Sequence, residues 1–422
     1  MCPHLLGHEE PPAHYRVLRG RGLDFDLVCE GCKEAAADGA AELVVVCEGC
    51  VERVASETSE LVGWVGTPGI DVRSEPVTVV RVGILGVQDH VLASDRAVAA
   101  WTDGWVTLSS LGEVRSHLGD EAEVVGHVDL DDLLESPVSR TRQPVLALHA
   151  SDDARFVAVA NDYGSTALVL ALESGTTTWL ERGSYHAEQT PYPCAFTRRA
   201  PDGPILVTAT AWNRLDVVDP ESREMLTETG NVIDYFHGAL YPSPDGRRVL
   251  DDGWVWSPVG MPELWNVDRW LTEDPSELER RQAGNSLGQR WYLWDTPMCW
   301  VDDRSIAIWG IGVDDEAMVE GVVVYDAEDL DEVISFGGVP KGQLWSNGHR
   351  LYAVDPAGLT VWDPFTGERT AEAPGVRPIA FNRWLDELVV IEEGGALGRI
   401  RLDPSAQALP GSSPPAGPRV LP

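Results

Sequence analysis

The residues best suited to chemistry in this chain are four of its seven cysteines. Cys29 and Cys32 form one Cys-x2-Cys pair, Cys47 and Cys50 form a second, and both pairs read Cys-Glu-Gly-Cys. Two such turns supply the four soft thiolate ligands that tetrahedral zinc prefers, and the glycine in each pair permits a tight bend. Because four thiolates leave no open position for water, we expect a structural Zn²⁺ and not a catalytic one.

The segments around the two pairs predict the elements that hold them. An extended apolar segment precedes each pair, at 25–28 and 42–46, and apolar residues within 51–61 fall at near-helical spacing. A knuckle, a strand and a helix that begins at a ligand pair resemble treble-clef zinc fingers over residues 23–62. Without that helix, the pattern favours a zinc ribbon. We therefore predict a small α+β zinc-binding module with an N-terminal arm over residues 1–70.

The N-terminal arm offers a second set of ligand types. Cys2, His4, His8 and His14 are close in sequence, and the segment from His8 to His14 has some likeness to the metalloprotease motif H-E-x-x-H. The motif fails because Pro12 stands where its second histidine belongs, and proline breaks the helix that the motif requires. A second metal site and an extended arm packed on the zinc module both remain open.

Charge and composition restrict the partners and the compartment. The formal charge is −36, from 32 basic and 68 acidic residues, which repels nucleic acid and anionic membranes. The charge fits simple solubility or a proteome bias, and also an acidic face for a basic protein partner. No segment approaches the ~20 apolar residues that span a bilayer, and the N-terminus does not read as a secretory signal. We expect a cytoplasmic monomer, with Cys194 and Cys299 as small buried side chains.

The larger part of the chain repeats a short β-rich pattern. A strand that ends in an aromatic residue and aspartate, a turn and a second strand recur at 322–338 and 359–375. A further copy lies at 215–230, and 168–183 is a looser copy that lacks the aspartate. A strand–turn–strand half precedes each copy, so each repeat predicts four strands. The pattern resembles bacterial WD40-type and YVTN-type β-propellers, and its closest single match is the Val-Trp-Asp-Pro-Phe-Thr-Gly-Glu segment at 361–368.

The repeats predict a mainly β fold, a seven-bladed β-propeller over residues 75–402. The seven units begin near residues 83, 145, 193, 237, 297, 343 and 376. The last unit lacks an outer strand, and 75–82 is suited to supply it, which would close the ring and remove the free sheet edges. We expect the acidic stretch 117–144 to be a loop and the Pro-rich tail 403–422 to be disordered.

The fourth unit carries an insertion, near 258–284, with a predicted helix. Leu264, Trp265, Val267, Trp270 and Leu271 lie near one stripe. Eight of the sixteen tryptophans fall between positions 254 and 309. They are suited either to pin the inserted helix onto the blades or to form a face for a partner or ligand.

No catalytic motif stands out, so we assign no catalytic residue. Polar residues where the units begin are more typical of turns and caps than of catalysis; they are Asp162, His186, Asp234, His237, Asp251 and Asp295. The favoured hypothesis is a non-catalytic protein-interaction scaffold. One alternative is a lactonase-like, metal-dependent propeller hydrolase with its site in the central funnel. Another is an acidic immunity protein that neutralises a basic toxin.

Overall fold

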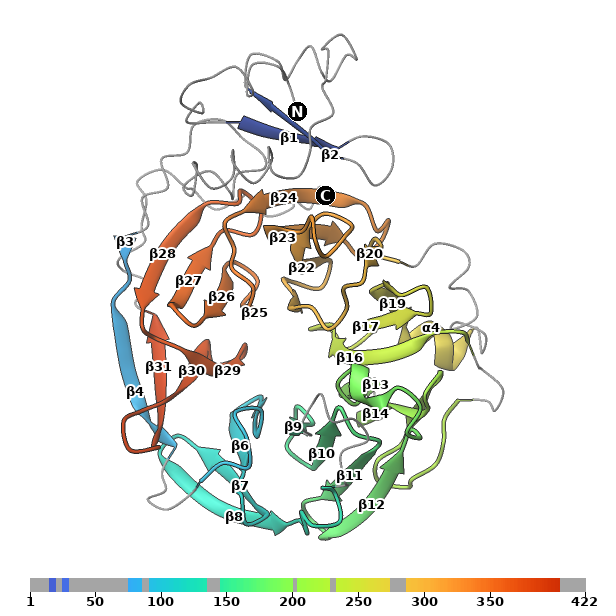
Figure 1. Cartoon of the computed structure of the whole chain (residues 1–422). Helices are drawn as coiled ribbons and strands as arrows, with labels where there is room; N and C mark the ends of the chain where they lie inside the picture. Colours follow the sequence, from blue (N-terminus) through green and yellow to red (C-terminus); the bar gives the residue numbers. More distant parts are fainter. Residues whose placement is uncertain are drawn as a thin grey trace, which may run out of the picture.

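The computed structural model describes residues 15–19, 25–29, 75–85, 91–134, 145–199, 203–227, 233–273 and 286–402. Within these ranges the chain forms seven sheets around a central axis, together with a two-stranded antiparallel sheet of β1 (Tyr15–Arg19) and β2 (Phe25–Cys29) (Figure 1). This arrangement confirms the predicted mainly β, seven-bladed propeller. None of the helices in the described ranges is long and apolar enough to cross a membrane.

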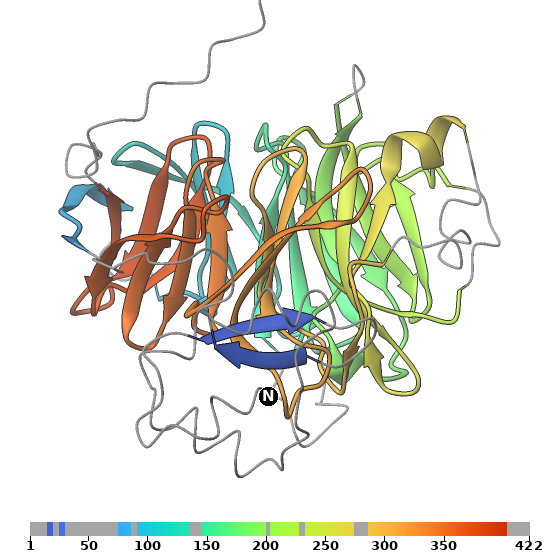
Figure 2. The same cartoon turned by 90° about the horizontal axis from the view of Figure 1, so that it is seen from above.

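Each sheet is called a blade here and is numbered along the chain, with its first strand beside the axis and its last at the rim. The strands run between the two faces of the disc (Figure 2). The first blade has β5 (Val98–Trp101), β6 (Gly104–Leu108), β7 (Glu113–Leu118) and β8 (Glu121–His127), the second has β9 (Val145–Ala150), β10 (Phe156–Asp162), β11 (Thr166–Ala171) and β12 (Thr176–Glu181), and the third has β13 (Cys194–Arg199), β14 (Gly203–Ala211) and β15 (Arg214–Val218). The fourth blade has β16 (Phe236–Pro242), β17 (Arg248–Val255) and β19 (Glu263–Asn266), with the short β18 (Val259–Gly260) and β20 (Arg290–Trp291). The fifth blade has β21 (Met298–Trp300), β22 (Ser305–Ile311), β23 (Val319–Asp326) and β24 (Glu332–Gly337), the sixth has β25 (Gln343–Ser346), β26 (Leu351–Asp355), β27 (Gly358–Trp362) and β28 (Arg369–Pro374), and the seventh has β29 (Pro378–Asn382), β30 (Glu387–Ile391) and β31 (Leu397–Leu402).

The hydrophobic core is divided among the junctions between blades. Within the described residues, each of the seven junctions, including the one between the seventh and first blades, has its own cluster of buried apolar side chains. Middle strands such as β10 and β22 are buried along their whole length because a neighbouring blade covers each of their faces. The rim strand β12 alternates between exposed and half-buried residues. The apolar middle strands therefore bind the disc together around its full circumference.

The ring is closed by the segment that precedes the first blade. β4 (Val79–Leu85) pairs antiparallel with β31, from Val79 opposite Leu402 to Leu85 opposite Leu397, and so becomes the rim strand of the seventh blade. Just before it, β3 (Glu75–Pro76) pairs parallel with β28 of the sixth blade. The predicted closure of the last unit by the N-terminal strand is confirmed.

Two predictions about the first blade were wrong. Its first strand begins at Val98 and not near residue 83, because the segment at 83 belongs to the seventh blade. The stretch 117–144 is not simply a loop, because it contains the end of β7 and the whole of β8. β8 is a rim strand and its residues are largely exposed, so it shows no apolar alternation by which a strand is recognised in a sequence.

The predicted helix of the fourth blade is shorter than its apolar stripe. Leu264 and Trp265 lie in β19, where they pair with Leu250 and Val249 of β17. The helix α4 (Val267–Thr272) starts only after Asn266, whose side chain accepts a hydrogen bond from the backbone N–H of Arg269. Sheet pairing therefore takes the first part of the stripe, and a side-chain cap sets the start of the helix.

A buried charge network crosses the closing junction. The Glu387 carboxylate, 2% exposed, accepts hydrogen bonds from Arg401 Nη2 at 2.9 Å and Arg399 Nη1 at 3.3 Å, both of the seventh blade. Its Oε2 also lies 3.4 Å from Nε1 of Trp105 in the first blade. In the same junction, Asn382 Nδ2 donates to the carbonyl oxygen of Gly104 at 2.8 Å. The last and first blades are thus joined by polar contacts as well as by apolar packing.

We expect removal of β4 to destabilise the whole ring. A chain that starts at residue 86 lacks β3 and β4, which leaves the β31 edge unpaired and uncovers the apolar junction beneath it. Its melting temperature should fall by about 10 °C or more, or the protein should aggregate. The matched control starts at residue 75 and keeps both strands. Equal melting curves and equal elution on size-exclusion chromatography for the two chains would contradict the closure.

Candidate functional site

Most of the predicted zinc ligands lie outside the described residues. Cys29 is the last residue of β2, whereas Cys32, Cys47 and Cys50 fall in segments that the structure does not describe. In the described part of the chain, no group of three or more His, Cys, Asp or Glu side chains is placed to hold a metal ion. Cys194 and Cys299 are both buried free thiols, as expected, and burial raises the pKa of Cys299 to about 12.

His237 and Asp251, two of the candidates where the units begin, form a buried structural pair. His237 Nδ1 lies 2.6 Å from Asp251 Oδ2, and both side chains are fully buried. The same carboxylate accepts hydrogen bonds from Trp265 Nε1 at 3.1 Å and from the backbone N–H of Gly238 at 3.0 Å. These bonds join β16, β17 and β19, so the pair stabilises the fourth blade from within.

Asp162 and Asp295 belong to a polar cluster that joins several blades, called the aspartate cluster here. Asp162, 1% exposed, lies 2.8 Å from Arg96 Nη1 and accepts a hydrogen bond from the backbone N–H of Tyr192. Asp295 accepts a hydrogen bond from the Tyr163 hydroxyl at 2.8 Å. Sequence reasoning missed Arg96 and Tyr163, because neither has a local pattern that marks it as a neighbour of these aspartates.

Asp252 is the third carboxyl group of the aspartate cluster. It is buried, and its Oδ2 accepts a hydrogen bond from the backbone N–H of Thr296 at 2.7 Å. Burial, followed by the negative charge of Asp295, raises its pKa well above the ordinary value. Burial also raises the pKa of Asp162, although the Arg96 guanidinium opposes that shift. The cluster therefore combines Asp252, whose carboxyl group holds its proton more tightly than usual, with the contact between Asp162 and Arg96.

Aromatic rings gather at one end of the third and fourth blades. This aromatic surface comprises Tyr185, His186, Trp212, Phe236, Trp254, Trp256 and Trp294. Phe236 and Trp254 stack at 4.2 Å between ring centroids, and Trp294 stacks on Trp254 at 4.8 Å. Phe236 and Trp254 are buried, whereas Tyr185 is 56% and Trp256 64% exposed. A packed base of rings therefore carries an exposed outer layer.

The tryptophans of the fourth-blade region serve two different purposes. Trp265 and Trp270 are buried in the junction between the third and fourth blades, where they hold β19 and α4 in place. Trp254, Trp256 and Trp294 instead belong to the aromatic surface. The packing role and the exposed face that the sequence offered as alternatives are both present, in different residues.

A cavity of about 500 Å³ lies around the axis at the other end of the first strands. Residues at or near the ends of the first strands of all seven blades line it: Ala100, Ala150, Phe196, Arg198, Tyr241, Met298, Trp300, Trp345, Phe381, Arg383 and Trp384 are among them. The aromatic surface and this central cavity are separated along a single strand, because Phe236 begins β16 and Tyr241 lies near its end. The propeller thus has chemically different features at its two ends.

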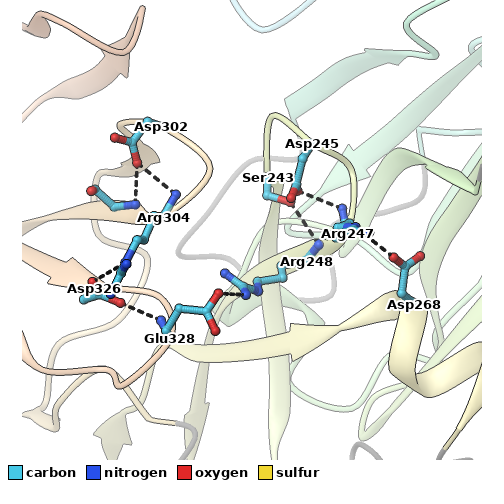
Figure 3. A network of polar contacts seen from close by, with 10 residues as sticks. Ser243, Asp245, Arg247, Arg248, Asp268, Asp302, Arg304, Asp326 and Glu328 are labelled. Carbon is cyan, nitrogen blue, oxygen red and sulfur yellow. Dashed lines mark hydrogen bonds and ion pairs between the residues drawn. The ribbon is translucent and has the colours of Figure 1, made fainter. Parts of the chain in front are cut away.

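Beside the central cavity, a charged groove of about 400 Å³ lies between the fourth and fifth blades. Figure 3 shows that Arg304 is bound to Asp326, with Nε 2.6 Å from Oδ2, and that Arg248 is paired with Glu328. Arg247 Nε lies 3.2 Å from Asp268 of α4. A further anion in the groove would compete with these carboxylates for the three arginines.

The turn beside this groove shows how the repeated sequence builds one face of the disc. In the Ser-Pro-Asp-Gly turn at 243–246, the Ser243 hydroxyl donates to Asp245 Oδ1, which also accepts from the backbone N–H of Arg247 (Figure 3). Ser151 and Asp153 form the same contacts in the second blade. The short polar side chains replace backbone hydrogen bonds that a tight turn leaves unmade.

Comparison with known proteins shows no close relative. No protein-family model matches the sequence, and no curated protein matches it. A chain from "Crystal Structure of Mitotic Checkpoint Complex" is similar with a TM-score of 0.49 and 11% identity, over 80% of this chain and 95% of that one. A chain of Kuenenia stuttgartiensis hydrazine synthase has a TM-score of 0.46 and 14% identity, over 75% of this chain and 98% of that one. Both scores are low, so the fold assignment rests on the sheets and their register.

We expect Asp252→Asn to stabilise the protein increasingly as the pH rises. The folded-state pKa of Asp252 is raised above the ordinary 3.8, so its protonation supports the fold at low pH, and that support is lost as the pH rises through the raised value. The amide cannot ionise, so the variant should match the wild type near pH 4 and exceed it at pH 8. Urea unfolding at both pH values measures the difference.

The control for this experiment is Asp103→Asn, at an exposed aspartate in the turn between β5 and β6. It should leave the free energy of unfolding nearly unchanged at both pH values. A stability gain for Asp252→Asn that is the same at pH 4 and pH 8 would show that Asp252 does not ionise differently in the folded and unfolded states.

Proposed function

We propose that this protein is a non-catalytic protein-interaction scaffold and that its partner docks on the aromatic surface. The observation that carries the proposal is the exposure of Tyr185 and Trp256 on a base of stacked, buried rings. Tyrosine and tryptophan contribute more than most residues to protein interfaces, because they combine a large apolar area with a polar atom. A rigid propeller that displays such rings matches the scaffold role expected of the fold.

The packing beneath the exposed rings supports their use in binding. Trp256 lies 5.7 Å from Trp254 and 5.2 Å from His186, and Tyr185 lies 5.2 Å from Trp212, measured between ring centroids. These neighbours restrict the outer rings before a partner arrives. Less side-chain entropy is then lost on binding, so more of the interaction energy appears as affinity.

The partner that best fits this surface is a basic protein segment. The chain carries a formal charge of −36, which attracts a cationic partner over long range and repels an acidic one. Glu188 lies 3.6 Å from His186 at the edge of the aromatic surface. Arginine stacks readily on tryptophan and tyrosine rings, so an arginine-bearing segment would use both the rings and the charge.

The test begins with capture of partners from host cells on the immobilised protein, at low and high salt. A basic protein captured at low salt should then be purified and its Kd measured by calorimetry against variants. We expect Trp256→Ala and Tyr185→Ala to weaken binding about tenfold or more each, as for central interface residues. Trp179→Ala is the matched control, because Trp179 is 44% exposed on β12, outside the aromatic surface.

Equal losses for Trp179→Ala and Trp256→Ala, or no loss for either, would contradict docking on the aromatic surface. If the captured protein is a toxin that this chain inactivates, the role is that of an acidic neutralising protein. The metal-dependent hydrolase stays a prediction, and no contact in the described residues favours it over the scaffold.

We also propose one structural Zn²⁺ bound by Cys29, Cys32, Cys47 and Cys50. The support is the sequence itself, since two Cys-Glu-Gly-Cys turns supply four thiolates at a spacing typical of structural zinc sites. The role of the ion would be to hold together a small module with little core of its own.

Metal content measured by mass spectrometry on protein purified without chelator should be about one zinc per chain. Cys47→Ser should reduce it to near zero, because a three-thiolate site binds zinc far more weakly. Cys2→Ser serves as the control and should leave the content unchanged. A second equivalent of zinc that disappears in Cys2→Ser would instead reveal a site in the N-terminal arm. Wild-type protein without zinc would overturn the proposal.

A further inference from the structure

We propose that the central cavity binds a small molecule with an apolar body and a single carboxylate, and that Arg383 holds the carboxylate. The cavity, about 500 Å³, has the size of ordinary small-molecule sites and is lined from all seven blades. Its ligand would lie at the end of the axis away from the aromatic surface. The inference is therefore independent of the proposed docking of a protein partner.

Arg383 is the feature that selects an anion. It follows β29, lines the cavity and is partly buried. Among the described residues no carboxylate forms a hydrogen bond or an ion pair with its guanidinium; Asp303 and Asp302 act on it only through the field of their charges. Burial lowers the pKa of Arg383 in spite of these two aspartates, so the group is less well compensated than it would be in water. A bound carboxylate would supply the missing partner, with two parallel N–H···O bonds.

Two other arginines at this end of the disc have carboxylate partners. Arg198, which also lines the cavity, has Nη2 2.6 Å from Asp152 Oδ2. In the neighbouring charged groove, Arg304 is paired with Asp326. An incoming carboxylate can therefore reach Arg383 without displacing an existing ion pair, which is not true of the other two arginines.

The remaining wall of the cavity is mixed: Asp152, Asp245, Ser243 and Ser346 line it together with several large apolar side chains, and this apolar part favours an apolar body. Trp345 and Phe381 have ring centroids 6.4 Å apart, with their planes tilted by 33°, and Met298 and Trp300 are buried side chains of the fifth blade. Flat, apolar walls of this kind attract an aromatic or aliphatic group, because its transfer from water to the cavity is favourable. A bare inorganic anion would gain nothing from these walls, so the expected ligand needs both parts.

The experiment is calorimetric titration of the full-length protein with three carboxylates of increasing size: phenylacetate, 4-phenylbutyrate and 2-naphthoate. 2-Naphthalenemethanol has the ring of 2-naphthoate without its charge. We expect at least one carboxylate to bind with a Kd below about 1 mM, within the range of small fragments in a pocket of this size. Arg383→Gln should weaken its binding about tenfold or more, which corresponds to about 1.4 kcal/mol. Binding of 2-naphthalenemethanol should stay unchanged in the variant.

Two further variants separate a role in binding from a role in folding. Arg383→Lys keeps the charge and should retain a large part of the affinity, whereas Arg377→Gln removes an exposed arginine just before β29 and should have no effect. Arg383→Gln should melt no lower than the wild type, because it removes a poorly compensated charge. The proposal is overturned if no carboxylate binds the wild type, or if Arg383→Gln weakens the alcohol as much as the acid.

Discussion

The pairing of β4 with β31 is the contact that makes the propeller a closed ring. It joins residues 79–85 to residues 397–402, more than three hundred positions apart in the chain, and completes the rim of the seventh blade. Without it, the apolar junction that contains Leu85, Ala380 and Val389 would lose one of its walls. Closure also covers the edge of β31 with β4, which becomes the rim strand in its place, and an uncovered edge is a usual route by which sheets aggregate. The buried Glu387 network reaches Trp105 and so adds a polar contact between the last blade and the first.

A closed ring gives each first strand two ends with different surroundings. In β16, Phe236 belongs to the aromatic surface at one end and Tyr241 lines the central cavity near the other, about 16 Å away at the rise of an extended strand. The aspartate cluster ties blades together through Arg96, Asp162 and Tyr163. Because the frame between the two ends is rigid, a protein partner and a small ligand could be bound by one molecule without sharing residues.

The charged residues also fall into two groups, those that form ion pairs within the propeller and those that do not. The chain has more than twice as many acidic as basic residues, and several of its arginines form ion pairs within a blade or between blades, among them Arg399 with Glu387 and Arg96 with Asp162. Such buried pairs are costly to break, because removal of one partner leaves the other charge buried without a counter-charge. The surplus carboxylates are available to the basic partner that we propose. Within the described residues, Arg383 lines the central cavity without such a pair.

The residue pattern was sufficient to predict the seven-bladed propeller, most of the unit boundaries and the closing strand. This was possible because each repeat has its own turns and apolar strands, which are local properties of the sequence. It failed at β8, since a rim strand exposed on both faces lacks alternation, and at β19, where pairing with β17 overrode a helical stripe. The pattern identified Asp162 and Asp295 as candidates, but it did not identify Arg96, Tyr163 and Asp252 as members of the same cluster. It also did not identify Arg383 as a residue of the central cavity. Those neighbours come from different blades, and only closure of the ring brings residues so distant in sequence to one axis. The proposed zinc ligands are the opposite case, since the spacing of two Cys-x2-Cys turns is by itself enough to predict a metal site.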